Sequence, residues 1–268
     1  MPRISIITIN YNNIEGLRNT LISIANQTDK NFEYIVVDGA SNDGSLEVIQ
    51  EYKDYITTWV SEKDKGVYDA MNKGVKMSSG EYVIFVNSGD KLHSSTVIQN
   101  LNQLSIDTDI CLGRVNNIYT NGKSYLWIPP QESMLSLQYL KWQPLHHPGA
   151  LIKRELQLKY PYDLNLKICA DRKFFIEALI LGNASYSTIP LIINEFGPQG
   201  ISGPQSEHKM YDEDNIIWQD LFPKRLYRDI ISTNWMIQNI SSIMARYYGK
   251  TKILCNINRC LMKIMRMK

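Results

Sequence analysis

The chain has 268 residues, of which 44% are hydrophobic and 21% are charged. That composition excludes a disordered, fibrous or low-complexity protein, and the length suits one large α/β domain with an extended carboxyl end. No segment offers the roughly 20 apolar residues of a membrane-spanning helix, and the apolar run Ile4 to Ile9 is too short for a signal peptide. The four cysteines show no metal-ligand spacing, which fits a reducing compartment. We therefore expect a cytoplasmic protein.

The net charge of +2 hides an asymmetry, because residues 224–268 contain ten basic residues and one acid. Apolar residues of this tail recur at roughly helical intervals, as at Ile253, Ile257 and Leu261. A basic amphipathic helix is typical of an interfacial membrane element. We therefore predict that residues 224–268 bind an anionic membrane surface, the inner face of the cell membrane. Nucleic acid is not an expected partner, since phosphate binding has no need of an apolar stripe.

The first hundred residues alternate between short apolar runs and helical patterns. Strands are predicted at residues 4–9, 34–37 and, more weakly, 56–60, and a run buried on both faces follows at residues 82–86. Alternation with short connections predicts right-handed crossovers and a parallel sheet. The residues that follow each strand then meet at one carboxyl edge, where open α/β folds bind their ligands.

The second half of the chain is less regular. A helix is predicted at residues 97–104 and a strand at 110–115. Residues 119–144 are aromatic and aperiodic, and we interpret them as a loop or flap. A helix is expected to open at Ala170, and residues 187–193 are predicted to form the last strand of the sheet.

Acidic residues follow three of the predicted strands at the carboxyl edge. Asp38 follows the second strand, Asp64 and Asp69 the third, and Asp90 the fourth, behind the small residues Ser88-Gly89. Oxygen ligands of this kind suit Mg²⁺ or Mn²⁺, which share the phosphates of a substrate. Neither common glycine-rich phosphate loop occurs in the chain. A phosphate is therefore expected to be held through a metal.

Four segments in this order resemble the inverting family 2 glycosyltransferases of the GT-A fold, and most closely the bacterial enzymes that build O-antigen, capsule or colanic-acid-like polysaccharide. They are Ser5 to Asn12, Val36 to Ser45, Glu62 to Gly74 and Gly80 to Asp90. The resemblance implies a GT-A domain over residues 1–223, with a mostly parallel central sheet flanked by helices. Residues 1–100 would bind the nucleotide sugar, residues 101–223 would form the acceptor side, and the helical tail would follow.

The resemblance also implies roles for residues at the first two strand ends. Thr8, Asn10 and Tyr11 would line the nucleoside pocket, with the Tyr11 ring as a face for the base; a packed loop aromatic is the alternative. Asp38 would bind the base or ribose. Here the sequence departs from the commoner pair of acids, because Gly39 occupies the second place.

The third and fourth strand ends would complete the donor site. Asp64 would support the sugar or diphosphate, and Asp69 either supports the site or is only a first-turn helix acid. Asn87-Ser88-Gly89-Asp90 stands where the family commonly has Asp-x-Asp-Asp. By this resemblance Asp90 keeps the carboxylate that binds Mn²⁺ or Mg²⁺, while Asn87, Ser88 and Gly89 belong to the donor site.

On the acceptor side, the resemblance makes Asp171 the general base, with a helix N-cap as its alternative role. Arg172 would contact phosphate. His146 and His147 would orient the acceptor or a phosphate, although a lone histidine is more often structural. Ser202 lies in a glycine-rich segment that resembles the family's late loop over the diphosphate.

We interpret the chain as a metal-dependent, inverting hexosyltransferase that moves a sugar from a nucleotide sugar, expected to be a UDP sugar, to a lipid-linked or polysaccharide acceptor. Two alternatives stay open on the sequence alone. One is a sugar-phosphate nucleotidyltransferase, which would want a basic glycine-rich loop after the first strand. The other is a non-catalytic nucleotide-binding or nucleic-acid-binding protein.

Overall fold

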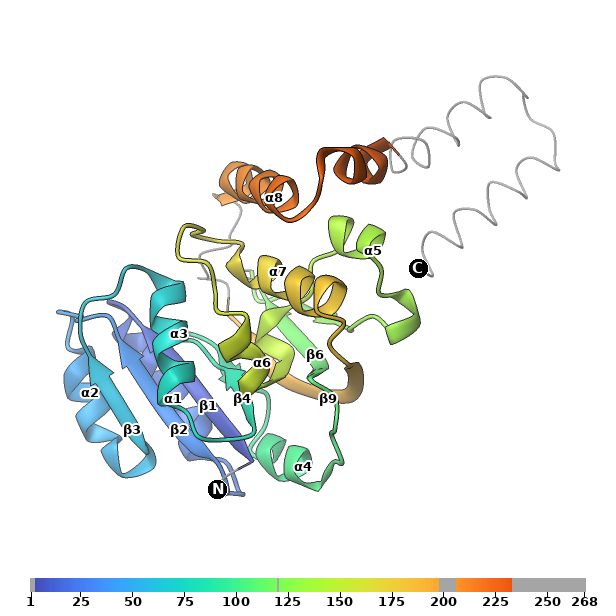
Figure 1. Cartoon of the computed structure of the whole chain (residues 1–268). Helices are drawn as coiled ribbons and strands as arrows, with labels where there is room; N and C mark the ends of the chain where they lie inside the picture. The colour runs from blue at the N-terminus through green and yellow to red at the C-terminus, as the bar shows by residue number, and fades with distance from the viewer. Residues whose placement is uncertain (1–2, 120, 198–205, 233–268) are drawn as a thin grey trace.

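The computed structural model describes residues 3–119, 121–197 and 206–232 (Figure 1). Its strands are β1 (Ile4–Asn10), β2 (Glu33–Asp38), β3 (Thr58–Ser61), β4 (Tyr82–Phe85), β5 (Lys91–Leu92), β6 (Ile110–Ile118), β7 (Ser124–Trp127), β8 (Ala150–Lys153) and β9 (Tyr186–Phe196). They form one sheet in the order β3-β2-β1-β4-β8-β6-β9-β5, with β7 paired to β6.

The α-helices are α1 (Ile14–Ala25), α2 (Ser45–Glu51), α3 (Val67–Met77), α4 (Val97–Gln103), α5 (Leu137–Trp142), α6 (Arg154–Lys159), α7 (Ala170–Phe175) and α8 (Glu207–Leu221). Three short 3₁₀ turns are η1 (Lys53–Tyr55), η2 (Glu132–Met134) and η3 (His147–Gly149), and the π-helix η4 (Ile176–Leu181) directly follows α7. The predicted strands and helices of the first hundred residues are confirmed, with small shifts at their ends.

The two halves of the sheet differ in strand direction. β1 pairs in parallel with β2 and β4, and β2 pairs in parallel with β3, as the alternating pattern predicts. Beyond β4 the directions mix, because β8 runs antiparallel to β4 and to β6, while β9 runs parallel to β6. The prediction of a loop at residues 119–144 is wrong in part, since β7 adds antiparallel to β6 and α5 forms after it.

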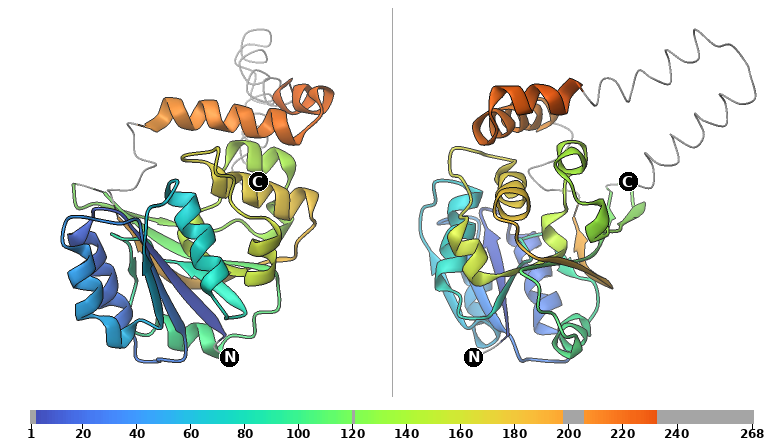
Figure 2. Two further views of the ribbon diagram at one scale, coloured as in Figure 1. Left: turned by 60° about the vertical axis from the view of Figure 1, so that its left-hand side comes forward. Right: turned by 45° about the vertical axis from the view of Figure 1, so that its right-hand side comes forward.

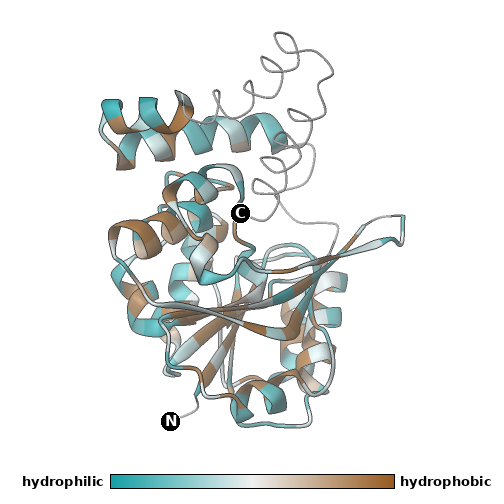
Figure 3. Ribbon diagram, turned by 90° about the vertical axis from the view of Figure 1, so that its right-hand side faces the viewer, coloured by the Kyte–Doolittle hydropathy of each residue, from teal (hydrophilic) through white to brown (hydrophobic). Residues whose placement is uncertain are grey.

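The core lies on both faces of the sheet. Along β1, Ile4 and Ile6 belong to one buried cluster, whereas Ile7 and Ile9 belong to the other, because successive side chains of a strand point to opposite faces. Figure 3 shows the apolar residues concentrated along the strands and the inner helix faces. Helix α3 packs closely on β1, since a Cβ at Gly74 would lie 2.4 Å from Cγ2 of Ile7.

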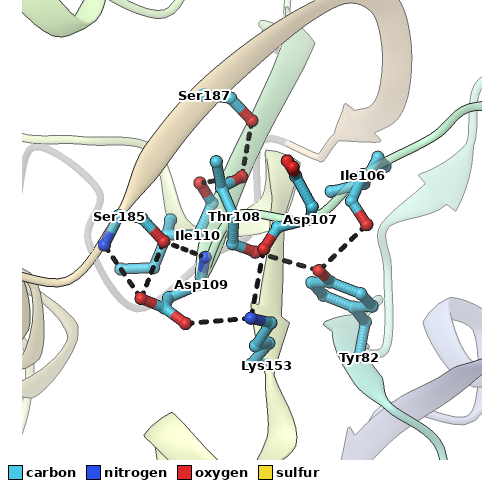
Figure 4. A network of polar contacts seen from close by, with 9 residues as sticks. All are labelled: Tyr82, Ile106, Asp107, Thr108, Asp109, Ile110, Lys153, Ser185 and Ser187. Carbon is cyan, nitrogen blue, oxygen red and sulfur yellow. Dashed lines mark hydrogen bonds and ion pairs between the residues drawn. The ribbon is translucent and has the colours of Figure 1, made fainter.

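A polar network lies at the edge of the sheet opposite the carboxyl ends of β1, β2 and β4 (Figure 4). Asp109 accepts hydrogen bonds at Oδ2 from the Ser185 backbone N–H (2.9 Å) and hydroxyl (2.7 Å), and its Oδ1 pairs with Nζ of Lys153 at 3.1 Å. The Tyr82 hydroxyl donates to the Thr108 carbonyl at 2.9 Å. These contacts join the start of β4, β6 and β9 to the end of β8, so the antiparallel strand is aligned with its neighbours.

Helix α8 lies outside α7, on the side turned away from the sheet (Figure 2). A helical segment follows at residues 224–232, where Ile230 is buried. The predicted amphipathic helix beyond it, at residues 233–268, lies outside the described residues. Among the residues that the structure does describe, no helix has both the length and the hydropathy that crossing a bilayer requires.

Candidate active site

Asp38 joins the ends of three parallel strands. Its Oδ1 accepts hydrogen bonds from Nδ2 of Asn10 at 2.9 Å and from the Ser41 hydroxyl at 2.6 Å. Its Oδ2 accepts from the Ser41 backbone N–H at 2.9 Å and from the Ser61 hydroxyl at 2.6 Å. Burial by itself would raise the pKa of Asp38, but these hydrogen bonds outweigh it and lower that pKa. Both oxygens of the carboxylate therefore accept two hydrogen bonds each from groups of the protein.

Two of the residues expected to contact the donor have structural contacts. Asp38 has no exposed surface and braces the strand ends, and its contact with a base or ribose stays a prediction. Thr8 is also fully buried: its hydroxyl donates to the Val86 carbonyl at 2.7 Å and accepts from the Tyr34 hydroxyl at 3.0 Å. Thr8 therefore ties β1 to the end of β4, and its place in a nucleoside pocket stays a prediction.

Tyr11 and Asp64 flank Gly39 at the carboxyl edge. A Cβ at Gly39 would lie 3.1 Å from Cδ2 of Tyr11 and 3.2 Å from Oδ2 of Asp64. A second acid in place of Gly39 would lie close to both groups and set a like charge beside Asp64. Tyr11 is 69% exposed, so its ring is free to take a planar ligand. Asn10, by contrast, is buried.

Lys73 on α3 forms ion pairs with the acids that follow β3. Its ammonium pairs with Asp64, with Glu62 at 2.9 Å and more loosely with Asp69 at 3.8 Å. Burial raises the pKa of Asp64, although the ion pair with Lys73 works in the opposite direction. Asp69 accepts the Lys65 backbone N–H at 3.0 Å from the first turn of α3. That contact favours the structural alternative for Asp69.

The sequence interpretation did not single out Lys73. It lies inside the quoted segment Glu62 to Gly74, and the signal that could have found it is its helical spacing from Asp69, four residues earlier.

A tight turn presents Asp90 after β4. The Asp90 backbone N–H donates to the Asn87 carbonyl at 2.8 Å, and Gly89 has a φ of 104°, a conformation that favours glycine. The Thr20 hydroxyl of α1 donates to the Asp90 carbonyl at 2.7 Å and accepts from the Gly89 N–H at 3.1 Å. Ser88 is fixed in turn by Asn13, whose Nδ2 donates to the Ser88 carbonyl at 3.1 Å. Helix α1 therefore sets the position of the turn.

The Asp90 side chain is 5% exposed, and its Oδ1 accepts the Gly197 backbone N–H at 3.0 Å. Burial raises the pKa of Asp90 to about 7. Gly197 also approaches the turn closely, because a Cβ there would lie 2.8 Å from the Gly89 carbonyl oxygen. The end of β9 therefore meets the turn at the carboxylate. Ser202, in the segment that follows Gly197, lies outside the described residues.

The protein side chains around Asp90 fit a divalent ion only if most of the ligand atoms come from the nucleotide sugar and water. No group of three or more His, Cys, Asp or Glu side chains able to hold a metal occurs within the described ranges. In the same ranges, Oδ1 of Asn87 is buried without a hydrogen-bond partner. A buried carboxylate with a raised pKa gains from a nearby cation. These residues fit Mg²⁺ or Mn²⁺ that takes its other oxygens from a diphosphate and water.

Asp171 lies at the start of α7, where Cys169 and not Asp171 is the N-cap residue. Its Oδ1 accepts the Arg172 backbone N–H at 2.8 Å and the Tyr68 hydroxyl at 3.4 Å. Burial raises the pKa of Asp171 to about 6. The alternative role of an N-cap is therefore wrong.

Aromatic contacts connect Asp171 to the end of β4. The Tyr68 ring lies 5.3 Å from the Tyr162 ring, which contacts His147 and Phe85. Phe85 is the last residue of β4, five residues before Asp90. Tyr68 belongs to α3, whose preceding loop carries Asp64. Asp171 therefore belongs to the same end of the sheet as Asp64 and Asp90.

The remaining acceptor-side candidates have structural contacts. His147 is buried, and its Nε2 lies 2.6 Å from the Tyr162 hydroxyl; burial lowers its pKa to about 3. His146 stacks on Trp127 with ring centres 4.5 Å apart, and burial lowers its pKa to about 4. Arg172 pairs with Asp214 at 2.7 Å. These contacts favour structural roles for His147 and Arg172, and a contact of either residue with acceptor or phosphate stays a prediction.

Comparison with solved structures identifies the fold. The structure of Staphylococcus aureus TarS residues 1–349 with UDP-GlcNAc matches with a TM-score of 0.63 at 18% identity, covering 93% of this chain and 77% of that one. The mannosyltransferase PcManGT of Pyrobaculum calidifontis, solved with GDP-Man and Mn²⁺, matches with a TM-score of 0.60 at 15% identity, covering 98% and 80%. The fold is that of the GT-A glycosyltransferases.

The family model described as "Glycosyl transferase family 2" matches residues 5–159, so the chain belongs to this family of glycosyltransferases. An uncharacterized glycosyltransferase of Mycobacterium tuberculosis is 26% identical over 219 residues, which cover 79% of this chain and 81% of that protein. The poly(ribitol-phosphate) β-N-acetylglucosaminyltransferase TarP of S. aureus is 40% identical over 98 residues, which cover 35% and 30%. The resemblance inferred from the sequence motifs is confirmed.

The hydrogen bonds of Asp38 predict a large stability effect for Asp38→Asn. The amide keeps the shape but turns an NH₂ toward groups that themselves donate, so we expect a loss of about 2–4 kcal/mol in the free energy of unfolding. Urea unfolding followed by circular dichroism measures it. Glu47→Gln, at an exposed position of α2, is the matched control and should change stability by less than about 0.5 kcal/mol. A loss that small for Asp38→Asn would contradict the bracing role.

Proposed function

We propose that this glycosyltransferase uses a UDP sugar as donor and a lipid-linked or polymeric saccharide as acceptor in the synthesis of a bacterial surface glycan. The observation that carries the proposal is the placement of two carboxylates, the buried Asp90 and the half-buried Asp171, at one end of the sheet with pKa values of about 7 and about 6. Support for the donor comes from TarS, which was solved with UDP-GlcNAc. Support for the acceptor class comes from TarP, which is named for poly(ribitol phosphate).

The donor binds at the carboxyl edge. The exposed Tyr11 ring offers a face for the uracil base, with Asp64 beside it across Gly39. Asp90 would hold Mn²⁺ or Mg²⁺ together with the donor diphosphate. When bound, the ion would stabilise the negative charge on the leaving diphosphate. The Asp90 turn is braced by Thr20 and Asn13 before any ligand arrives, so its position costs little to establish on binding.

Asp171 is the general base of the transfer. The acceptor hydroxyl oxygen bonds to the anomeric carbon from the side opposite the diphosphate, and the bond from that carbon to the diphosphate oxygen breaks. The diphosphate leaves with the electron pair, the hydroxyl proton passes to a carboxylate oxygen of Asp171, and the configuration inverts. A pKa of about 6 suits this role near neutral pH, because the carboxylate is ionised yet basic enough to take a proton.

The base assignment predicts the outcome of Asp171→Asn. We expect kcat for sugar transfer to fall by about 10²–10⁴-fold, while UDP binding measured by calorimetry stays within about twofold. In the wild type, kcat should rise with pH through about 6 and stay level above it, because only the ionised Asp171 accepts the proton. Transfer by the Asn variant at near wild-type rates would sink the assignment.

The burial of Asp90 predicts opposite effects of Asp90→Asn on stability and on ligand response. The pKa of Asp90 is higher in the folded than in the unfolded chain, so its ionisation weakens the fold as pH rises toward about 7. At pH 8 without metal, the Asn variant should be more stable than wild type by up to roughly 4 kcal/mol, and at pH 4 nearly equal. Thermal unfolding with UDP and Mn²⁺ should show stabilisation of the wild type only. Equal stabilisation of the variant would refute Asp90 as the metal ligand.

We further propose that the basic carboxyl end docks the enzyme on an anionic, cytoplasmic membrane face. Residues 233–268 contain seven basic residues and no acid, and each Lys or Arg near such a surface contributes about 1 kcal/mol. Truncation after Ser232 retains the buried Ile230. The truncated protein should no longer sediment with phosphatidylserine vesicles, while UDP binding is unchanged. Phosphatidylcholine vesicles are the control, and continued sedimentation with phosphatidylserine would contradict the docking role.

A further inference from the structure

Helix α8 holds the backbone that leads into α7. Glu213 of α8 is buried, and its Oε1 accepts the Lys167 backbone N–H at 2.8 Å. Its Oε2 accepts the backbone N–H groups of Ile168 and Cys169, both at 2.9 Å. One carboxylate therefore satisfies three successive amides, and the last of them lies two residues before Asp171.

The next residue of α8 holds the other side of Asp171. Asp214 Oδ1 pairs with Nε of Arg172 at 2.7 Å and accepts from Nε1 of Trp218 at 2.9 Å. Its Oδ2 pairs with the buried ammonium of Lys141 at 2.6 Å. Arg172 also donates to the carbonyls of Leu140 and Lys141 on α5. The residue after Asp171 is thus fixed between α5 and α8.

Tyr68 of α3 contacts the same segment from the side of the sheet. Its hydroxyl donates to the Ile168 carbonyl and lies 3.4 Å from Oδ1 of Asp171. The segment 167–172 is therefore clamped between α3, which belongs to the donor half, and α8, which lies outside it. Side chains that act on a reacting group need this support, because a displacement of about 1 Å can cost on the order of 100-fold in rate.

We propose that α8 is a positioning element for the base, with Glu213 as its principal positioning residue and Asp214 as its second. The inference rests on the proposed function, since it takes Asp171 to be the base. Anchoring of α8 does not by itself require Glu213, because Ile217 and Trp218 already bury the inner face of the helix. Burying a carboxylate is costly unless hydrogen bonds compensate, and here every compensating bond goes to the segment that carries Asp171.

The test compares Glu213→Gln with Asp220→Asn. Asp220 is the matched control because it also links α8 to α7, through Lys173 at 3.0 Å, but its side chain is 62% exposed and touches none of residues 167–169. We expect Glu213→Gln to lower kcat by about tenfold or more, with the dissociation constant of UDP within about twofold of wild type. Glu213→Asp keeps the charge on a shorter arm and should recover part of kcat. Asp220→Asn should leave kcat within about twofold.

A pH profile separates positioning from a general loss of folded protein. The charged and titratable groups that face Asp171 are Tyr68, Tyr162, Cys169 and Arg172. If Glu213→Gln loosens the segment, Asp171 becomes better solvated, and the acidic limb of the kcat profile moves to lower pH. If the variant is only less stable, its kcat falls at every pH while the acidic limb stays at the wild-type pH. That outcome overturns the proposal.

Failure of Asp171 as the base and failure of α8 as a positioning element give different results. If Asp171→Asn retains transfer, the base assignment itself falls. If Asp171→Asn is inactive but Glu213→Gln keeps wild-type kcat and pH profile, only the positioning role of α8 is overturned. Should Glu213→Gln not fold, Glu213→Asp and Asp214→Asn carry the same comparison, and unchanged kcat and pH profile in both would overturn the proposal.

Discussion

The hydrogen bonds of the Asp38 carboxylate hold the ends of β1, β2 and β3 in one polar junction. Parallel pairing brings these ends to the same edge of the sheet, but backbone pairing alone leaves the loops after them free to separate. A buried carboxylate that accepts from Asn10, Ser41 and Ser61 removes that freedom. The exposed Tyr11 ring and the Asp64 carboxylate then lie across Gly39 from each other, on loops that this junction holds in place.

Burial has opposite consequences for the acids of this edge. Asp38 is saturated with donors, so its pKa falls and it is a structural group. Asp90 and Asp171 accept fewer hydrogen bonds than Asp38, so desolvation dominates and their pKa values rise. A carboxylate in that condition gains free energy from a cation or a proton. The proposed metal ligand and the proposed base are thus the acids whose burial is least compensated.

The second half of the molecule brings Asp171, the proposed base, to the end of the sheet that carries Asp64 and Asp90. β8 and β9 extend the sheet beyond β4, and α5, α7 and α8 pack outside it (Figure 1). The contacts of Glu213 with residues 167–169 and of Asp214 with Arg172 come from a helix that follows β9 in the chain. Placement of the proposed base therefore depends on elements from three separate parts of the sequence.

The strand ends of residues 1–100, their parallel order and the family could be predicted from the sequence, because these follow from local periodicity and from motifs of adjacent residues. Asp90 could be proposed from its place in the fourth motif, and Asp171 from its place at the start of a late helix. Which polar residues already have partners is visible only in the folded protein. Thr8, Asp38, His147 and Arg172 are occupied by partners 15 to 78 residues away in the chain. Glu213 meets its amides across 44 to 46 residues. Such contacts arise from packing of distant elements, and no local pattern encodes them.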